Sequence, residues 1–129
     1  ESVRRGERRL VQQFRHGELI PAMALGSITP AQLAERIAAG EDLVLLDVRE
    51  DDEFALGHLE GSVHVKLGEL MSRVNELDPD ATTVCICHHG IRSARAASWL
   101  ATQEFESLLN LSGGVDRWAN EVDPEFPRY

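Results

Sequence analysis

The residues most suited to chemistry lie in one stretch, VCICHHGIRSAR, which runs from Val84 to Arg95. A short apolar run ends at Cys87, and four residues, His88 to Ile91, separate that cysteine from Arg92. A thiol beside two imidazoles points either to metal binding or to nucleophilic sulfur chemistry. The residues around this stretch indicate which of the two interpretations is correct.

The pattern around Cys87 predicts a strand, a tight turn at Gly90 and a helix that begins near Arg92 or Ser93. Such a turn directs successive backbone N–H groups inward, and the helix N-terminus adds its own free N–H groups and positive dipole end. We therefore expect a stabilised thiolate with a lowered pKa, which makes Cys87 a nucleophile. The same cradle would hold a charged persulfide without a metal or an organic cofactor.

A metal site built from Cys85, Cys87, His88 and His89 is the alternative. Four neighbouring residues rarely surround one ion, because the usual zinc spacings separate the ligand pairs. We therefore expect no metal here. Cys85 lies inside the strand and is interpreted as a core residue. His88 and His89 either line the mouth of the pocket, where they donate to substrate, or face solvent.

The remaining pattern alternates helices with buried strands. Continuous apolar runs are typical of strands covered on both faces of a parallel sheet. We therefore expect an α/β fold, with a central parallel sheet and helices on both of its faces. Helices are expected over 30–40 (after a Thr29–Gln32 capping box), 49–57, 67–77, 93–103 and 115–122. Strands are expected over 42–48, 61–65, 82–87 and 107–111, with an extended tail after residue 122.

Three features fall at the carboxyl ends of expected strands: Asp47, Cys87 and the Gly113-Gly114 turn. In open parallel sheets, ligands bind beyond these ends. The stretch that holds Cys87 is therefore where an active site is expected.

Charge and composition limit the function further. The 129 residues carry a net charge of −9, and because residues 1–20 contribute +2, the rest carries −11. An acidic body argues against nucleic-acid binding, and no apolar run approaches the length of a membrane span. Two cysteines too close to bridge each other indicate a reducing, cytoplasmic setting. We expect an arginine-rich helical arm or linker over 1–26 and one domain over 27–129.

Three segments, LLDVREDDEFALGHLEGSVHV, VCICHHGIRSARAASWL and LLNLSGGVDRWANEVDPEFPRY, together resemble the single-domain rhodanese family of sulfurtransferases. The resemblance implies that Cys87 carries a sulfane sulfur as a persulfide, with His88, His89, Gly90, Ile91 and Arg92 as its cradle. Asp47 and Arg49 become an architectural pair beneath the loop. The implied partners are a small sulfur donor or a persulfide protein, and a thiophilic acceptor that could be a protein; no cofactor is implied.

Two other functions stay open. Phosphatases and arsenate reductases of similar fold have five residues between cysteine and arginine, whereas this chain has four, which favours a sulfur adduct over a tetrahedral phosphate. A non-catalytic docking module is the second alternative. Many family members have Arg, Lys or Ser where this chain has His88, His89 and Ile91, so we expect weak capture of thiosulfate and a persulfide as donor. Arg92 either stabilises substrate charge or locks the loop through a carboxylate.

Overall fold

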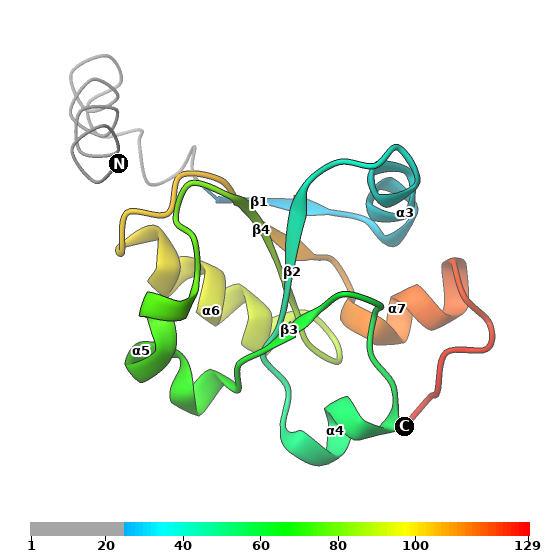
Figure 1. Cartoon of the computed structure of the whole chain (residues 1–129). Coiled ribbons are helices and arrows are strands. Elements are labelled where there is room, and N and C mark those ends of the chain that lie inside the picture. The colour runs from blue at the N-terminus through cyan, green and yellow to red at the C-terminus, as the bar shows by residue number, and fades with distance from the viewer. Residues whose placement is uncertain (1–24) are drawn as a thin grey trace.

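Five parallel strands form the centre of the structure, in the order β1-β5-β4-β2-β3 (Figure 1). This computed structural model describes residues 25–129. The expected N-terminal arm lies, as far as residue 24, outside the described residues. The strands are β1 (Leu25–Ile28), β2 (Leu43–Asp47), β3 (Val63–His64), β4 (Thr82–Ile86) and β5 (Leu108–Leu111).

Helices cover both faces of this sheet, as Figure 1 shows, with α3 (Pro30–Ala38) and α7 (Gly114–Glu121) on one face and α5 (Leu70–Arg73) and α6 (Ile91–Ala101) on the other. The expected α/β fold with a central parallel sheet is confirmed. Three short helical segments complete the described chain: α4 (Asp51–Leu56), η2 (Leu67–Glu69) and η3 (Val74–Glu76).

Two hydrophobic cores lie on the two faces of the sheet. Successive residues of β4 alternate between them: Val84 and Ile86 pack with α3 and α7, whereas Cys85 and Cys87 pack with α5 and α6. Because side chains alternate across a strand, a strand buried on both faces reads as a continuous apolar run. The apolar runs in the sequence were therefore a sound indication of a parallel sheet.

Local signals explain most of the element boundaries. Thr29 Oγ1 accepts from the Gln32 N–H and Gln32 Oε1 accepts from the Thr29 N–H, so the predicted capping box starts α3. The helix expected over 67–77 is wrong in detail, because it is divided into η2, α5 and η3. Gly68 and Val74 both have low helix propensity, which disfavours one continuous helix.

Two strands differ from expectation. The strand expected over 61–65 pairs only at Val63 and His64, and β1, a four-residue edge strand that pairs with β5, was not predicted. Its sequence, LGSI, is too short to show a period. Within residues 25–129, no helix is both long and apolar enough to cross a membrane.

Candidate active site

Cys87 lies directly beyond the carboxyl end of β4, and only 1% of its surface is exposed. Its Sγ atom accepts hydrogen bonds from the backbone N–H groups of Gly90, at 3.1 Å, and Ser93, at 3.3 Å. Two amide dipoles therefore point at the sulfur and favour negative charge on it. The loop and the first turn of α6 together form a cradle around this atom.

Ser93 and Asn110 add a polar network that the sequence analysis did not identify. The Ser93 hydroxyl lies 3.2 Å from Cys87 Sγ and donates to Asn110 Oδ1 at 2.5 Å. Asn110 Nδ2 in turn donates to the Gly90 carbonyl at 3.0 Å. The Ser93 hydroxyl has only one proton, and that proton is donated to Asn110. In the hydrogen bond between Ser93 and Cys87, a protonated thiol is therefore the donor and Ser93 Oγ the acceptor. The signal for this network was a polar residue, Asn110, inside an apolar strand.

The first turn of α7 supports the loop from the other side. The carbonyl groups of Cys87 and His88 accept hydrogen bonds from the N–H groups of Val115, at 2.9 Å, and Asp116, at 3.0 Å. The two segments are so close that a Cβ atom on Gly114 would clash with the carbonyl oxygens of Cys87 and His88. The φ of Gly114 is +62°, which residues with side chains rarely adopt. Glycine is therefore required where α7 meets the loop.

Arg92 is paired with a carboxylate and does not point freely into the cradle. Its two terminal nitrogens donate to the two carboxylate oxygens of Glu53 at 2.7 and 2.8 Å. The hydrogen bonds from Arg92 hold the pKa of Glu53 down to about 2, despite partial burial, and those to Glu53 raise the pKa of Arg92. Of the two roles considered for Arg92, the geometry corresponds to the carboxylate lock. Glu53 itself was not singled out from the sequence.

Asp47 and Arg49 form a fully buried ion pair behind the loop. Arg49 Nε lies 2.9 Å and Nη2 2.8 Å from the two carboxylate oxygens of Asp47, and Nη2 also donates to the Gly57 carbonyl. Buried charges are stable only when paired and hydrogen-bonded. The remaining Arg49 nitrogen, Nη1, donates to the Tyr129 hydroxyl at 2.9 Å, and that hydroxyl donates to Glu53 Oε2 at 3.0 Å. Tyr129 thus joins the buried pair to the Glu53–Arg92 pair.

The side chains of His88, His89 and Ile91 lie at the outer side of the loop. His88 is partly buried and its ring stacks on that of Tyr129, with centroids 3.9 Å apart. Burial, helped by the neighbouring His89, lowers the pKa of His88 and favours its neutral form. The side chain of His89 is 60% exposed and Ile91 is 67% exposed. At the mouth of the site, His88 therefore offers a neutral ring and Ile91 an apolar side chain, where a Lys or Arg would offer a fixed positive charge.

Cys85 lies two residues before Cys87, on the same face of the sheet, but in a different environment. It is fully buried in the core below α6, and burial raises the pKa of its thiol to about 12. Its thiol is therefore protonated at neutral pH and serves as packing. The two cysteines have different environments because Cys85 lies inside β4, whereas Cys87 lies beyond its end, in the loop.

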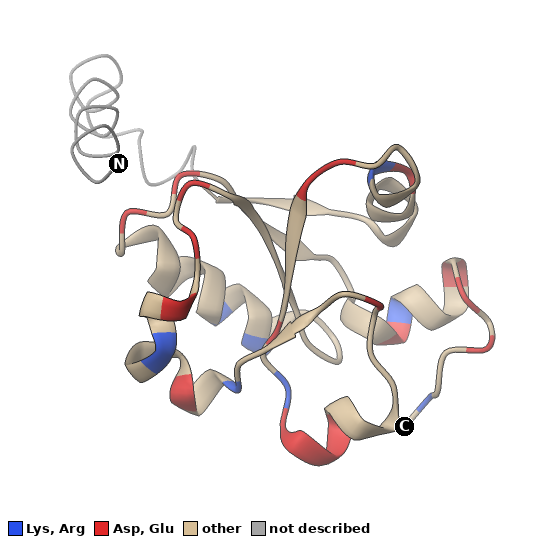
Figure 2. Cartoon of the chain, viewed as in Figure 1, with Lys and Arg blue, Asp and Glu red and all other residues tan. Residues whose placement is uncertain are grey.

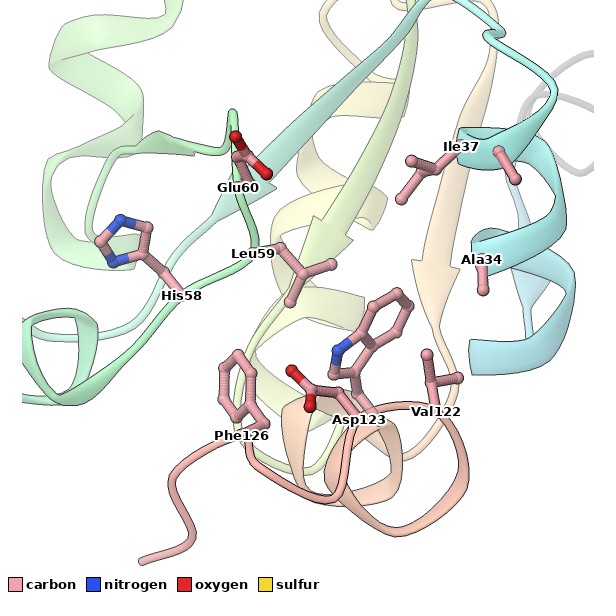
Figure 3. Close-up of a pocket in the computed structure, with 10 residues that line it drawn as sticks. Ala34, Ile37, His58, Leu59, Glu60, Val122, Asp123 and Phe126 are labelled. Carbon is pink, nitrogen blue, oxygen red and sulfur yellow. The ribbon is translucent and has the colours of Figure 1, made fainter.

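A hollow of about 460 Å³ lies between α3 and α7, on the opposite face of the sheet from the Cys87 side chain (Figure 3). Its walls are mostly apolar, and none of its lining residues is a cysteine or serine. It therefore offers no thiol, in contrast to the Cys87 loop. The hollow is lined by Ala34, Ile37, Ala38, His58, Leu59, Glu60, Trp118, Val122, Asp123 and Phe126.

Residues 29–121 match the family model of the rhodanese-like domain. The chain belongs to the rhodanese-like domain family. A putative sulfurtransferase of Bacillus subtilis, YtwF, is 38% identical over 103 residues, which span 80% of this chain and 99% of that protein. The thiosulfate sulfurtransferase GlpE of Ectopseudomonas mendocina is 37% identical over 91 residues, or 70% of this chain and 82% of GlpE.

Solved structures agree with this membership. The crystal structure of a rhodanese-related protein from Thermoplasma volcanium is 33% identical, with a TM-score of 0.68 over 74% of this chain and 92% of that one. The rhodanese-like fold therefore carries the Cys87 loop described above.

Replacing Gly114 tests how tightly this rhodanese-like domain holds its loop. We expect Gly114→Ala to lower the free energy of unfolding by about 2 to 4 kcal/mol, because left-handed backbone and a backbone clash add up. Gly61→Ala is the matched control, since Gly61 has a φ of +81° but a Cβ atom there would meet nothing within 4 Å. For the control, we expect the free energy of unfolding, measured in urea, to fall by about 1 kcal/mol. Equal losses for both variants would contradict close docking of α7 on the loop.

The Glu53–Arg92 pair predicts a pH-dependent coupling. The pKa of Glu53 is lower in the folded protein than its usual 4.5, so the stability gained from the pair is complete above about pH 5. That stability is lost as the pH falls toward 2. In a double-mutant cycle with Glu53→Gln and Arg92→Gln, we expect a coupling of about 1 to 2 kcal/mol at pH 7, allowing for solvent screening. A coupling that stayed constant from pH 7 to pH 3 would contradict this account.

Proposed function

We propose that this rhodanese-like protein is a sulfurtransferase in which Cys87 carries sulfur as a persulfide. The observation that carries the proposal is the pair of backbone N–H groups, from Gly90 and Ser93, that converge on Cys87 Sγ. They favour the charged forms of the sulfur that such a reaction needs, a thiolate before transfer and a persulfide anion after it. The names of YtwF and GlpE support the same reaction class.

The first half-reaction loads the cysteine. The Cys87 thiolate attacks the sulfane sulfur of the donor, a new S–S bond forms, and the bond between that sulfur and the rest of the donor breaks. The donor remnant leaves with the electron pair, as sulfite from thiosulfate or as a thiolate from a persulfide. Negative charge moves to the outer sulfur, which forms beside the Sγ atom at which the N–H groups of Gly90 and Ser93 are directed.

The second half-reaction transfers the outer sulfur from Cys87 to an acceptor. A thiophilic acceptor, either cyanide or the thiolate of a small molecule or an acceptor protein, attacks the outer sulfur. The bond from acceptor to sulfur forms, the S–S bond breaks, and Cys87 returns as a thiolate. No net oxidation occurs over the cycle, so this proposal needs no cofactor.

The donor that we propose is a persulfide, on a small thiol or on a protein, in preference to thiosulfate. Acidic residues outnumber basic ones over the described domain. Three consecutive acidic residues, Asp51, Asp52 and Glu53, begin α4 near the site (Figure 2). Glu53 also neutralises Arg92, so the loop presents no free guanidinium to a compact dianion. Local attraction for thiosulfate is therefore small.

The same contacts weigh against a phosphatase or arsenate reductase. Four residues separate Cys87 from Arg92, and the N–H groups of Gly90 and Ser93 are already directed at the sulfur. A docking module would need no such cradle around a buried thiol. Both cysteines are free thiols, and we propose the reducing cytoplasm as the compartment.

Steady-state sulfur transfer to cyanide tests the proposal. We expect Cys87→Ser to lower kcat/KM at least about a thousandfold, because the carrier atom is lost. Cys85→Ser is the matched control and should retain activity within about threefold in the fraction that folds, which circular dichroism would quantify. Loss of activity in Cys85→Ser with retention in Cys87→Ser would reverse the assignment, and phosphate-ester hydrolysis that depends on Cys87 would favour the phosphatase.

Donor preference gives a separate prediction. We expect kcat/KM for glutathione persulfide to exceed that for thiosulfate at least about tenfold, since thiosulfate brings both of its charges close to the reacting sulfur. His89→Arg should raise kcat/KM for thiosulfate about threefold to tenfold, because it places a cation at the exposed edge of the loop. Gln103→Arg is the control, because Gln103 is exposed and lies beyond the end of α6 that is opposite the loop. A wild-type preference for thiosulfate would overturn the donor assignment while leaving Cys87 as the carrier.

A further inference from the structure

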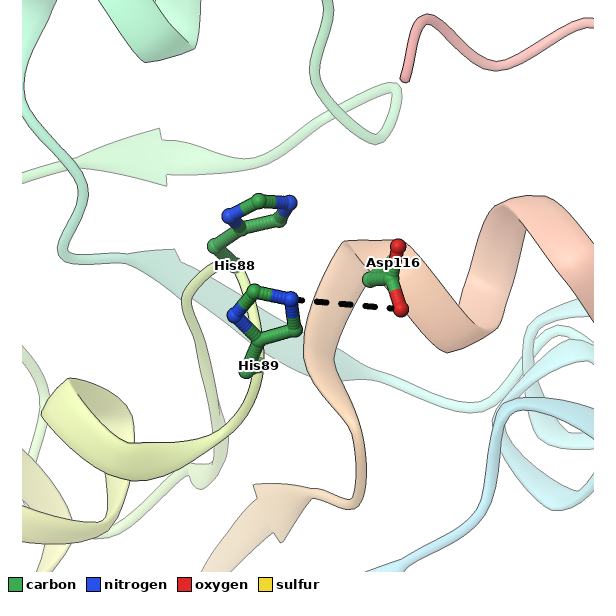
Figure 4. A group of neighbouring side chains, drawn as sticks. All are labelled: His88, His89 and Asp116. Carbon is green, nitrogen blue, oxygen red and sulfur yellow. Dashed lines mark ion pairs between the residues drawn. The ribbon is translucent and has the colours of Figure 1, made fainter. Parts of the chain in front are cut away.

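Two imidazoles and a carboxylate gather at the outer side of the Cys87 loop (Figure 4). His88 and His89 follow the cysteine, and Asp116 lies in the first turn of α7. One nitrogen or oxygen atom from each of the three lies within 4.8 Å of the others, and His89 Nε2 is 4.0 Å from Asp116 Oδ2. Figure 4 shows both rings on the side of the loop that faces Asp116.

The backbone already holds these three residues in position. The Asp116 N–H donates to the His88 carbonyl at 3.0 Å, which fixes the first turn of α7 against the loop. The His88 ring is held between Tyr129 and His89, with each pair of ring centroids 3.9 Å apart. The backbone and the His88 ring therefore lose little conformational freedom when a ligand is bound, and only the side chains of His89 and Asp116 have to be ordered.

The ring nitrogens of the two histidines are available. Among residues 25–129, no hydrogen bond is formed by a ring nitrogen of His88 or His89, whereas those of His58 and His64 bond to backbone carbonyl groups. A histidine that serves the fold usually has such a partner, because buried or half-buried polar atoms are seldom left unpaired. His88 and His89 therefore have unused coordinating capacity.

We propose that His88, His89 and Asp116 form a binding site for a divalent first-row transition metal ion, of which Zn²⁺ is the test case. Imidazole and carboxylate are ligands that Zn²⁺ prefers, at about 2.0 to 2.2 Å. Donor atoms up to 4.8 Å apart reach those distances through small side-chain rotations, because the side chains of His89 and Asp116 are 60% and 44% exposed. Three protein ligands leave a fourth position open for water.

This site differs from the one that the sequence suggested and that we argued against. Cys85 and Cys87 are buried on the core side of the strand and contribute no ligand to it. The third ligand is instead Asp116, which no sequence spacing connects to His88 and His89. The inference does not depend on the proposed sulfur transfer, since no ligand is a sulfur atom.

Titration calorimetry with Zn²⁺ tests the site, and Cys87→Ser separates it from binding at the thiol. We expect one Zn²⁺ per chain, with a Kd in Cys87→Ser within about threefold of wild type. His89→Ala and Asp116→Asn in the Cys87→Ser protein should each weaken Zn²⁺ binding at least about tenfold. Mutation of residues that only support a metal ligand already lowers metal affinity by that factor. His58→Gln and Asp52→Asn are the matched controls and should leave Kd unchanged.

A second readout uses the link between binding and stability. Because the ion would connect the loop to α7, saturating Zn²⁺ should raise the Tm of Cys87→Ser and leave that of its His89→Ala derivative unchanged. Loss of binding in Cys87→Ser alone would assign the ion to the thiol and overturn the proposal. Equal effects of the ligand and control variants, or absence of binding at millimolar Zn²⁺, would also overturn it.

Discussion

The structure depends on one constraint: the N–H groups of Gly90 and Ser93 must both reach Cys87 Sγ. This convergence requires a loop that reverses within four residues, which Gly90 permits with a φ of +99°. It also requires a fixed position for the loop, which the docking of α7 on the carbonyl groups of Cys87 and His88 provides. The parallel sheet contributes by bringing the end of β4 and the start of α7 to the same edge.

A second layer of support consists of charges. Asp47 and Arg49 are buried together, and Tyr129 connects them to Glu53, which in turn holds Arg92. Each polar group in this series forms a hydrogen bond with the next, so no charge near the core is left without a partner. This arrangement bears on the donor that we propose: because the arginine of the loop is held by a carboxylate, it supports a persulfide in preference to a compact anion.

Much of the fold could be predicted from the sequence, because it depends on patterns that are local. The capping box at Thr29, the apolar runs of β2 and β4 and the glycines after β5 all act within a few residues. The strand β1 could not be predicted, because four residues carry too little periodicity. The segment from 67 to 77 was misjudged for the opposite reason, since apolar spacing there concealed residues of low helix propensity.

The candidate site was less accessible to sequence reasoning, because its contacts join distant residues. Arg92 meets Glu53 across 39 positions, and Arg49 meets Tyr129 across 80. Ser93 and Asn110 become neighbours only when α6 lies on β5. A spacing rule can indicate that a thiol ends a strand, but it cannot identify which carboxylate neutralises an arginine or which residue faces a histidine. Those partners are set by the three-dimensional packing of the sheet and its helices.

Intact-protein mass spectrometry tests the central claim, that Cys87 carries the sulfur, most directly. The protein would be exposed to glutathione persulfide and, separately, to thiosulfate, and the excess donor would be removed. Its intact mass would then be measured before and after treatment with cyanide. The account predicts a mass gain of one sulfur atom in wild type and in Cys85→Ser, absent from Cys87→Ser and reversed by cyanide. A protein that gained no sulfur from either donor, or gained it equally in Cys87→Ser, would contradict the account.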